Sequence, residues 1–238
     1  MTRVPATHLA ELAWVEVPDR TLLLVPTGSC EQHGPHLPLD VDLRIARAVA
    51  GEVAGRFDDV VVGPELAIGA SGEHQSFPGT LSIGTEVLVS VIVELCRSAL
   101  PPPGSALPAP FSGVLFVNGH GGNVEAFAAA LPLLRAEGRA VEVWHPQVPG
   151  GDSHAGRTET SLLLHLDPGC VREDRLPVGS TARWREIGDV VRAEGLAAVT
   201  PNGVLGDATT ATAEEGAVVF DQLVADLRAA VARFATST

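Results

Sequence analysis

Several residue types are scarce or missing in this chain of 238 residues. Lysine and tyrosine are both absent, so arginine supplies the basic charge. Only 16 basic residues stand against 29 acidic ones, which gives a formal net charge of −13 and a sequence pI of about 4.9. Nucleic acid and anionic membrane surfaces attract basic stripes, and the sequence has none. We therefore expect neither as a partner.

Cysteine is also scarce, and long apolar runs are missing. The three cysteines, Cys30, Cys96 and Cys170, are odd in number and form no CxxC pair, so a disulfide framework or a zinc ribbon is not indicated. Residues 1–20 carry charges and no long apolar core, which argues against a signal peptide. No apolar run reaches the roughly 18–20 residues that span a bilayer. We expect a cytoplasmic protein.

The remaining composition is that of an ordinary folded domain. Hydrophobic residues make up 45% of the chain and charged residues 19%, so disorder is not expected. The length fits one large domain better than two. A globule of this size buries about 70–75% of its unfolded surface and needs no disulfide or structural metal for stability. We predict a single domain over residues 1–238.

The order of apolar patterns predicts the fold class. Short apolar runs indicate strands at residues 21–26, 60–62, 113–117 and 140–144, and helical spacing covers residues 42–57, 85–100, 123–137 and 157–166. This alternation favours an α/β fold whose mostly parallel sheet is flanked by helices on both faces. Thr212 and Glu215 form a capping box before the clearest helix, which is the last one. Residues 168–211 give no clear pattern.

Side chains that bind metals gather where the predicted strands end. Within twelve residues, the segment after the first strand contains Glu31, His33, His36, Asp40 and Asp42. His120 lies in NGHGGN after the third strand, and Asp152, His154 and Glu159 follow the fourth. Because parallel strands present their carboxyl ends at one edge of a sheet, we expect these groups to meet there.

The residue types and their spacing point to a metal site. Glu31 and His33 are two residues apart, so in extended backbone they point the same way. Imidazole and carboxylate groups together suit zinc, manganese or iron. A carboxylate such as Asp42 has two oxygens and can bridge two ions, which lie roughly 3.5–4 Å apart in two-metal hydrolases.

Glycines surround His120 in NGHGGN. We expect Gly119, Gly121 and Gly122 to let the backbone approach a metal or substrate closely and to adopt positive φ. Asn118 and Asn123 could tie this turn together.

Four segments in a fixed order resemble the creatininase family of amidohydrolases. The segments are EQHGPHLPL from Glu31 with Asp42, SGEHQSFPGT from Ser71 to Thr80, NGHGGN around His120, and HAG from His154 with Glu159. They lie between residues 26 and 161. The resemblance implies a creatininase-like three-layer sandwich, two divalent metal ions per subunit (zinc, iron or manganese) and a homo-oligomer, a hexamer or larger.

The resemblance also implies roles for individual residues. The implied ligands are Glu31 and His120 for one ion, His33 and Glu159 for the other, and Asp42 as the bridge. His154 matches a family histidine that handles protons. The chain departs from creatininase at Gly122, where creatininase has a ligand glutamate. Glu159 would supply the missing carboxylate, and this departure argues against creatinine as the substrate.

Other segments bear on the substrate. Around the expected centre, Glu73, His74, Gly121 and Gly122 are predicted to contact substrate, although Glu73 and His74 could equally order their loop or an oligomer contact. The segments LLLVPTGSCEQHGPHLPLDVD, HAGRTETSLLL and GVLGDATTATAEEG are most similar to one branch of the family. That branch trims the modified precursor peptide of mycofactocin biosynthesis and releases a C-terminal Val-Tyr-derived core.

Two alternatives stay open at this point. The chain could act on creatinine or on a formamidopyrimidine nucleotide, like other members of the family. It could also be a metal-binding scaffold without activity, which would predict a missing ligand. If the chain is a hydrolase, two ions would lower the pKa of a water that attacks an amide carbonyl, and His154 would give a proton to the leaving nitrogen.

Overall fold

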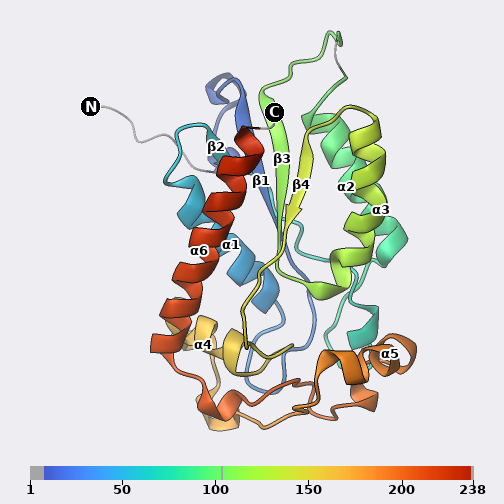
Figure 1. The fold of residues 1–238 in the computed structure, drawn as a ribbon, viewed down its shortest axis with the longest axis vertical. Coiled ribbons are helices and arrows are strands. Elements are labelled where there is room, and N and C mark those ends of the chain that lie inside the picture. Colours follow the sequence, from blue (N-terminus) through green and yellow to red (C-terminus); the bar gives the residue numbers. More distant parts are fainter. Residues whose placement is uncertain (1–7, 103, 237–238) are drawn as a thin grey trace.

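A four-stranded parallel sheet forms the centre of the protein in a computed structural model that describes residues 8–102 and 104–236 (Figure 1). The strands are β1 (Thr21–Thr27), β2 (Val60–Val62), β3 (Phe111–Asn118) and β4 (Val141–Trp144). Their order across the sheet is β2-β1-β3-β4, and each neighbouring pair is parallel. The predicted strands and their parallel arrangement are confirmed.

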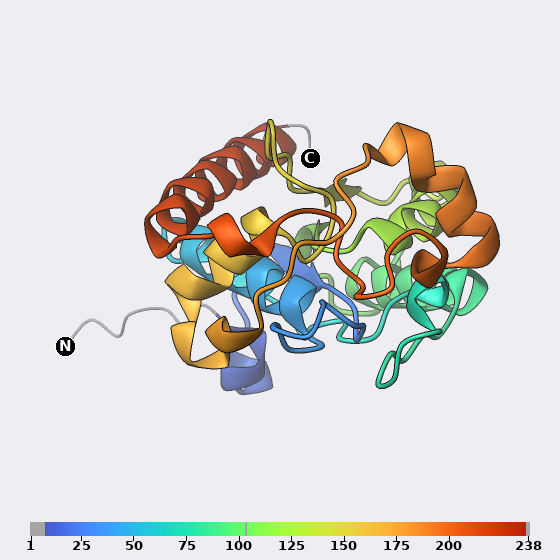
Figure 2. The same ribbon diagram turned by 90° about the horizontal axis from the view of Figure 1, so that it is seen from below.

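Helices cover both faces of this sheet (Figures 1 and 2). On one face lie α1 (Val41–Ala54), α4 (Arg157–Leu166) and α6 (Ala213–Ala235), and on the other lie α2 (Thr85–Ala99) and α3 (Val124–Ala136). Because both faces are covered, every residue of β1 is buried. The predicted three-layer α/β architecture is confirmed.

The alternation of side chains along β1 divides the core into two halves. Leu22 and Leu24 belong to the core under α1, α4 and α6, whereas Leu23 and Val25 belong to the core under α2 and α3. Strand β1 therefore packs into both halves of the core, and this packing fixes the position of its carboxyl end.

The start of α6 departs in part from the predicted capping box. The backbone N–H of Glu215 donates to Thr212 Oγ1 at 3.1 Å, as predicted. The Glu215 carboxylate instead lies 3.1 Å from Arg157 Nε, and Ser161 Oγ accepts from the Thr212 N–H. The reciprocal half of the box is therefore wrong, because α4 supplies closer partners.

The segment without a clear pattern, residues 168–211, contains one further helix, α5 (Trp184–Glu194), and several short 3-10 turns. It passes beneath the carboxyl edge of the sheet, which is the view in Figure 2. All three cysteines are free, as expected. Within the described part of the chain, each helix is too short or too polar to cross a lipid bilayer.

Candidate metal centre

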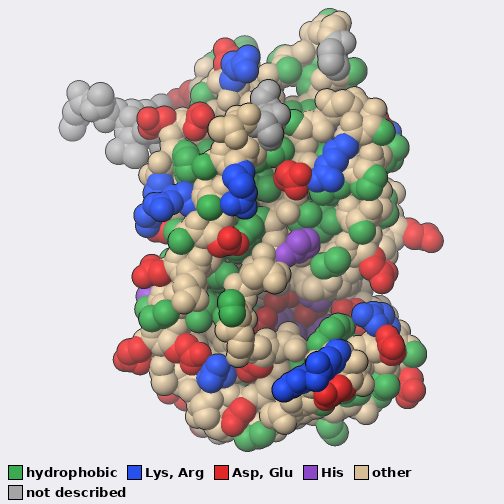
Figure 3. All heavy atoms as spheres, in the orientation of Figure 1, with side chains coloured by type: hydrophobic (Ala, Val, Ile, Leu, Met, Phe, Trp, Pro, Cys, Tyr) green, Lys and Arg blue, Asp and Glu red, His purple; other side chains and the backbone are tan. Residues whose placement is uncertain are grey.

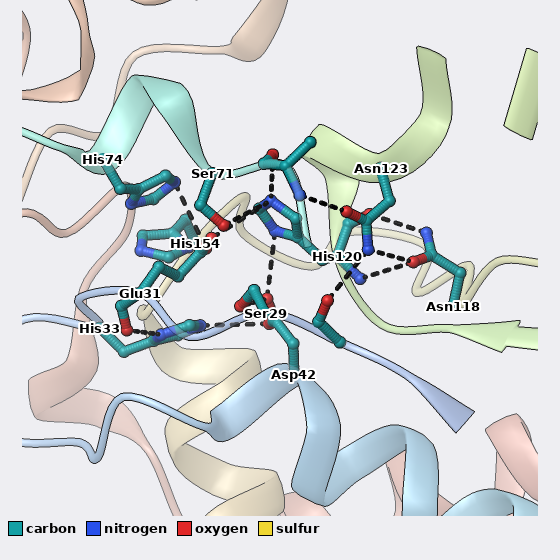
Figure 4. Close-up of polar contacts among 12 residues, drawn as sticks. Ser29, Glu31, His33, Asp42, Ser71, His74, Asn118, His120, Asn123 and His154 are labelled. Carbon is teal, nitrogen blue, oxygen red and sulfur yellow. Dashed lines mark hydrogen bonds and ion pairs between the residues drawn. The ribbon is translucent and has the colours of Figure 1, made fainter. Parts of the chain in front are cut away.

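The carboxyl edge of the sheet brings six predicted site residues together, and Figure 4 shows five of them. Around one centre lie Glu31 and His33 after β1, Asp42 in the first turn of α1, His120 after β3, His154 just before α4, and Glu159 in the first turn of α4. All except Glu159 are at most 9% exposed. A group of ionisable side chains this deep requires charge partners or a bound ion.

His33 faces two carboxylates. Its Nε2 lies 3.1 Å from Asp42 Oδ1 and 3.8 Å from Glu159 Oε2. Its Nδ1 lies 3.1 Å from the backbone oxygen of Glu31, which accepts the Nδ1 proton. Metal-binding histidines commonly donate their second ring N–H to a carbonyl in this way. The ring therefore presents Nε2 to Asp42 and Glu159.

His120 lies between two carboxylates as well. Its Nδ1 is 3.1 Å from Asp42 Oδ2, and its Nε2 is 3.2 Å from Glu31 Oε2. Nε2 is also 3.1 Å from the backbone oxygen of Ala70. Asp42 thus contacts His33 with one oxygen and His120 with the other, and so links the two histidines.

The electrostatics of these groups follow from burial opposed by neighbouring charges. Burial alone would lower the pKa of His33, but the adjacent Asp42 carboxylate raises it to about 10. Burial would raise the pKa of Glu31, but His120 beside it lowers it to about 2. For Glu159, burial dominates and raises the pKa to about 7. At neutral pH, these shifts favour an ionised Glu31 and a protonated His33, while Glu159 titrates near neutrality.

The donor set fits divalent cations. Both carboxylate oxygens of Glu31 are buried and have no hydrogen-bond partner within the described residues, an arrangement that a cation would satisfy. Three groups of donors each have ligand atoms within 4.8 Å of one another: Glu31, His33 and Asp42; His33, His154 and Glu159; Glu31, His74 and His154. None of the three contains His120, although that residue contacts both Glu31 and Asp42.

Polar side chains hold the donors in place. Ser29 Oγ donates to Asp42 Oδ2 at 2.6 Å. Asn123 Nδ2 donates to Asn118 Oδ1 at 2.9 Å, and Asn118 Nδ2 donates to the backbone oxygen of His120 at 2.7 Å. The two asparagines tie the NGHGGN turn together, as the sequence suggested.

Two of the three glycines in this turn, Gly119 and Gly122, serve close packing. Positive φ was predicted for Gly119, Gly121 and Gly122, and that prediction is wrong, because none of them has it. A Cβ on Gly119 would collide with the backbone of Asp42, and one on Gly122 would collide with His120 and lie 2.7 Å from Glu73 Oε1. The Glu73 carboxylate therefore occupies space next to Gly122 that a side chain there would need.

The remaining predicted residues lie at different distances from the centre. Glu73 Oε1 is 3.9 Å from His120 Nε2, and His74 Nε2 is 3.3 Å from Glu31 Oε1, so both border the cluster. Gly121 is exposed and has open space beside it. His36 lies apart and pairs with Thr160 Oγ1 at 2.8 Å.

Two acidic residues of the sequence clusters have structural partners instead. Asp40 pairs with Arg44 at 2.7 Å. Asp152 accepts from the backbone N–H groups of Arg157 and Thr158 at the start of α4. Sequence reasoning missed Ser29, Gln32 and Ser71 as partners of the cluster, because a hydroxyl or amide carries no signal until its neighbour in space is known.

Two hollows border the cluster from different sides. One of about 300 Å³ is lined by residues 150–153, 180–183 and 205–207 with Arg157 and Thr210, and so reaches Ser153 beside His154. The other, of about 260 Å³, is lined by residues 72–73 and 191–195 with Ser76, and so reaches Glu73. Figure 3 shows a hollow above the α5 segment with acidic and histidine side chains inside it. The two hollows therefore adjoin the cluster at Ser153 and at Glu73.

The profile of one family, described as creatinine amidohydrolase, matches residues 10–231. The chain belongs to the creatininase family. It is 54% identical over 209 residues to the mycofactocin precursor peptide peptidase of Mycolicibacterium smegmatis, covering 85% of this chain and 81% of that protein. It is 50% identical over 222 residues to the peptidase of the same name from Mycobacterium tuberculosis, covering 89% and 85%.

Similarity to creatininases themselves is lower but spans the whole fold. The creatinine amidohydrolase of Pseudomonas putida is 28% identical over 260 residues, covering 95% of this chain and 96% of that protein. A manganese creatininase structure matches with a TM-score of 0.75 at 26% identity, covering 95% of this chain and 97% of that one. A mutant creatininase of the Zn-Zn type matches at 0.74 and 27%, with the same coverage. The chain therefore combines the fold of the creatininase family with a buried set of side chains that could hold metal ions.

Proposed function

We propose that the protein is a dinuclear metal-dependent peptidase that hydrolyses the modified mycofactocin precursor peptide and releases its C-terminal Val-Tyr-derived core. One observation carries the proposal: both carboxylate oxygens of Glu31 have no hydrogen-bond partner among residues 8–102 and 104–236, and they lie inside a buried histidine and carboxylate cluster. The likeness to two peptidases of that name, at 54% and 50% identity, supports the substrate. At 28% identity, the creatinine amidohydrolase is a more distant relative.

Five residues would hold two divalent ions per subunit, which we propose to be zinc, iron or manganese. Our proposed ligands are Glu31, His33, Asp42, His120 and Glu159. The two oxygens of Asp42, each 3.1 Å from a different histidine, support its role as the bridge. Bound ions would supply Lewis-acid activation of a water and of the scissile carbonyl.

His154 is the residue we propose to move the proton. Its ring centroid lies 4.4 Å from that of His33, at the edge of the cluster. Burial and the neighbouring His33 and His74 keep the pKa of His154 well below its ordinary value, so the imidazole starts neutral. It would take a proton from water as the new C–O bond forms and deliver it to the leaving nitrogen as the C–N bond breaks.

The two hollows would hold the peptide on either side of the scissile bond. Both hollows have charges of either sign. The first is lined by Arg157 and Arg183 together with Asp152 and Asp207, and the second by Glu73 and Glu194 together with Arg192. A peptide that passes from one hollow to the other would cross the cluster between Ser153 and Glu73. Creatinine would fill little of this space, so the shape favours a larger substrate.

Cleavage of the substrate itself tests the proposal. Zinc- or manganese-loaded protein is incubated with the processed precursor peptide, with creatinine in a parallel reaction, and both are followed by mass spectrometry. We expect metal-dependent loss of the C-terminal core and unchanged creatinine, with no reaction after chelation. If the peptide stays intact and creatinine is consumed, the proposed substrate is wrong, whereas the proposed metal centre is unaffected.

We also propose a homo-oligomer, a hexamer or larger, in a single domain over residues 1–238. The family resemblance supports the assembly, and the exposed apolar side chains of Leu81 and Val87, 55% and 53% exposed, offer surface for it. Light scattering after size-exclusion chromatography gives the mass directly. A mass equal to one chain of 24.7 kDa would contradict the proposal.

A further inference from the structure

Gln32 lies between two buried histidines, His74 and His154, and contacts both. Its side chain is almost fully buried, as are His74 and His154. Its Nε2 lies 3.1 Å from His74 Nδ1, 3.0 Å from His154 Nε2 and 2.9 Å from the backbone oxygen of Gly203. The amide has two hydrogens, so it can donate in at most two of these three contacts.

Two backbone groups fix the orientation of the Gln32 amide. The N–H of Gly34 donates to Oε1 at 2.9 Å, so this atom is the oxygen. The carbonyl of Gly203 can only accept, so the atom facing it is the NH₂ group. Gly203 has φ of +76°, and a Cβ there would collide with the Gln32 amide. The backbone on both sides is therefore shaped around this one side chain.

The tautomer of His154 then follows from a backbone carbonyl. His154 Nε2 lies 2.9 Å from the backbone oxygen of Gln32, which can only accept a hydrogen bond. Nε2 must therefore carry the proton. Nδ1 lies 3.8 Å from Glu31 Oε1, too far for a hydrogen bond, so no acceptor holds a second proton there. Nδ1 presents its lone pair to the cluster.

The tautomer of His74 follows from the count of amide hydrogens. The NH₂ group has two hydrogens, and one goes to Gly203. His154 Nε2 is already a donor, so the second hydrogen goes to His74 Nδ1. His74 is then protonated at Nε2, which lies 3.3 Å from Glu31 Oε1. Because Nδ1 accepts from Gln32 and Nε2 carries the proton, His74 offers no lone pair to an ion.

We propose that Gln32 is a positioning residue that fixes the tautomers of both histidines. Its backbone carbonyl turns the His154 lone pair toward the cluster, where the proposed function needs a proton acceptor. Its side-chain amide places the His74 proton on Nε2, on the side of Glu31, and so leaves His74 without a lone pair for an ion. The effect of these tautomers on catalysis rests on the proposed function. The tautomers themselves do not depend on the substrate.

Nitrogen NMR of the histidine rings tests the inference directly. In zinc-loaded, ¹⁵N-labelled protein, long-range proton–nitrogen spectra distinguish the Nδ1–H from the Nε2–H form, and His74→Ala and His154→Ala spectra assign the signals. We expect Nε2–H for both residues. A protonated Nδ1 on either histidine would overturn the proposal, whatever the enzyme cleaves.

The Gln32→Glu substitution separates the two contacts. A carboxylate replaces the amide hydrogens, so His74 must donate from Nδ1, whereas His154 still donates to the backbone oxygen at position 32. We expect the His74 signal to change form and the His154 signal to keep it. Gln32→Met removes the side-chain hydrogen bonds without adding charge, and should leave the His154 form unchanged as well. The exposed Gln222→Glu is the matched control and should alter neither signal.

Kinetics with the peptide show what the positioning contributes. Loss of a hydrogen bond behind a metal centre typically costs on the order of 10–100-fold in activity or metal affinity. We expect Gln32→Met to lower kcat by about this factor with KM nearly unchanged, and Gln222→Glu to match the wild type. A variant with unchanged kcat, despite the altered His74 form, would contradict a positioning role.

Discussion

At the scale of the residue, the centre depends on which atom each side chain presents. His33 donates from Nδ1 to a backbone oxygen, and its Nε2 faces carboxylates. Each of the two oxygens of Asp42 contacts a different histidine. A sequence can predict that glutamate, histidine and aspartate will meet at a strand end. It cannot predict which ring nitrogen of a histidine carries the proton, because the deciding partners are distant in the sequence. His120 contacts the backbone oxygen of Ala70, and His154 contacts that of Gln32.

His154→Ala should separate proton transfer from metal binding. We expect metal content to remain as in the wild type and kcat to fall roughly 10²–10⁴-fold, the usual contribution of a general acid–base residue. Mass spectrometry of metal content and a peptide cleavage assay measure the two effects. The exposed His165→Ala is the control and should change neither. If metal is lost from the His154 variant, His154 belongs among the ligands.

At the scale of the element, short caps decide where the site residues lie. Asp152 accepts from the N–H groups of Arg157 and Thr158, and so begins α4, whose first turn carries Glu159. The sequence grouped Asp152 with the metal-binding residues, because in a sequence a carboxylate near a histidine can be either a metal ligand or a helix cap. Its contacts show a helix cap instead.

Asp152→Ala should therefore loosen α4 and the metal centre together. Loss of a carboxylate that accepts from the first backbone N–H groups of a helix costs about 1 kcal/mol of unfolding free energy, by analogy with N-cap side chains. We expect weaker metal retention because Glu159 loses its fixed position. Urea unfolding and metal titration measure the two effects. Asp152→Asn keeps an acceptor and should lie near the wild type, as should the exposed Asp189→Ala. Full stability in Asp152→Ala would contradict the cap.

The sequence predicted four strands and five helices at this scale and missed α5. Buried strands and amphipathic helices carry their patterns in the chain itself. Helix α5 is short, contains Gly188, and begins after Arg183, which is no usual N-cap residue. Its stability comes from packing of Val191 against Leu196 and Leu205, which lie outside the helix.

At the scale of the whole molecule, the centre rests on a core built from both faces of the sheet. Leu24 lies in the central strand and is fully buried, whereas Leu107 lies in a surface loop and is 67% exposed. We expect Leu24→Ala to lower the unfolding free energy by about 2–5 kcal/mol. Leu107→Ala, the same chemical change, should remain within about 0.5 kcal/mol of the wild type. Similar losses in urea unfolding would contradict the assigned core.

The central claim is that this edge of the sheet holds two ions bridged by Asp42, and metal content tests it most directly. Inductively coupled plasma mass spectrometry of the purified chain should give two divalent ions per subunit. Asp42→Asn should lose at least one of them, while Asp40→Asn, whose carboxylate pairs with Arg44 outside the cluster, should retain both. Wild-type protein that binds no divalent ion, or an Asp42 variant that retains two, would contradict the account.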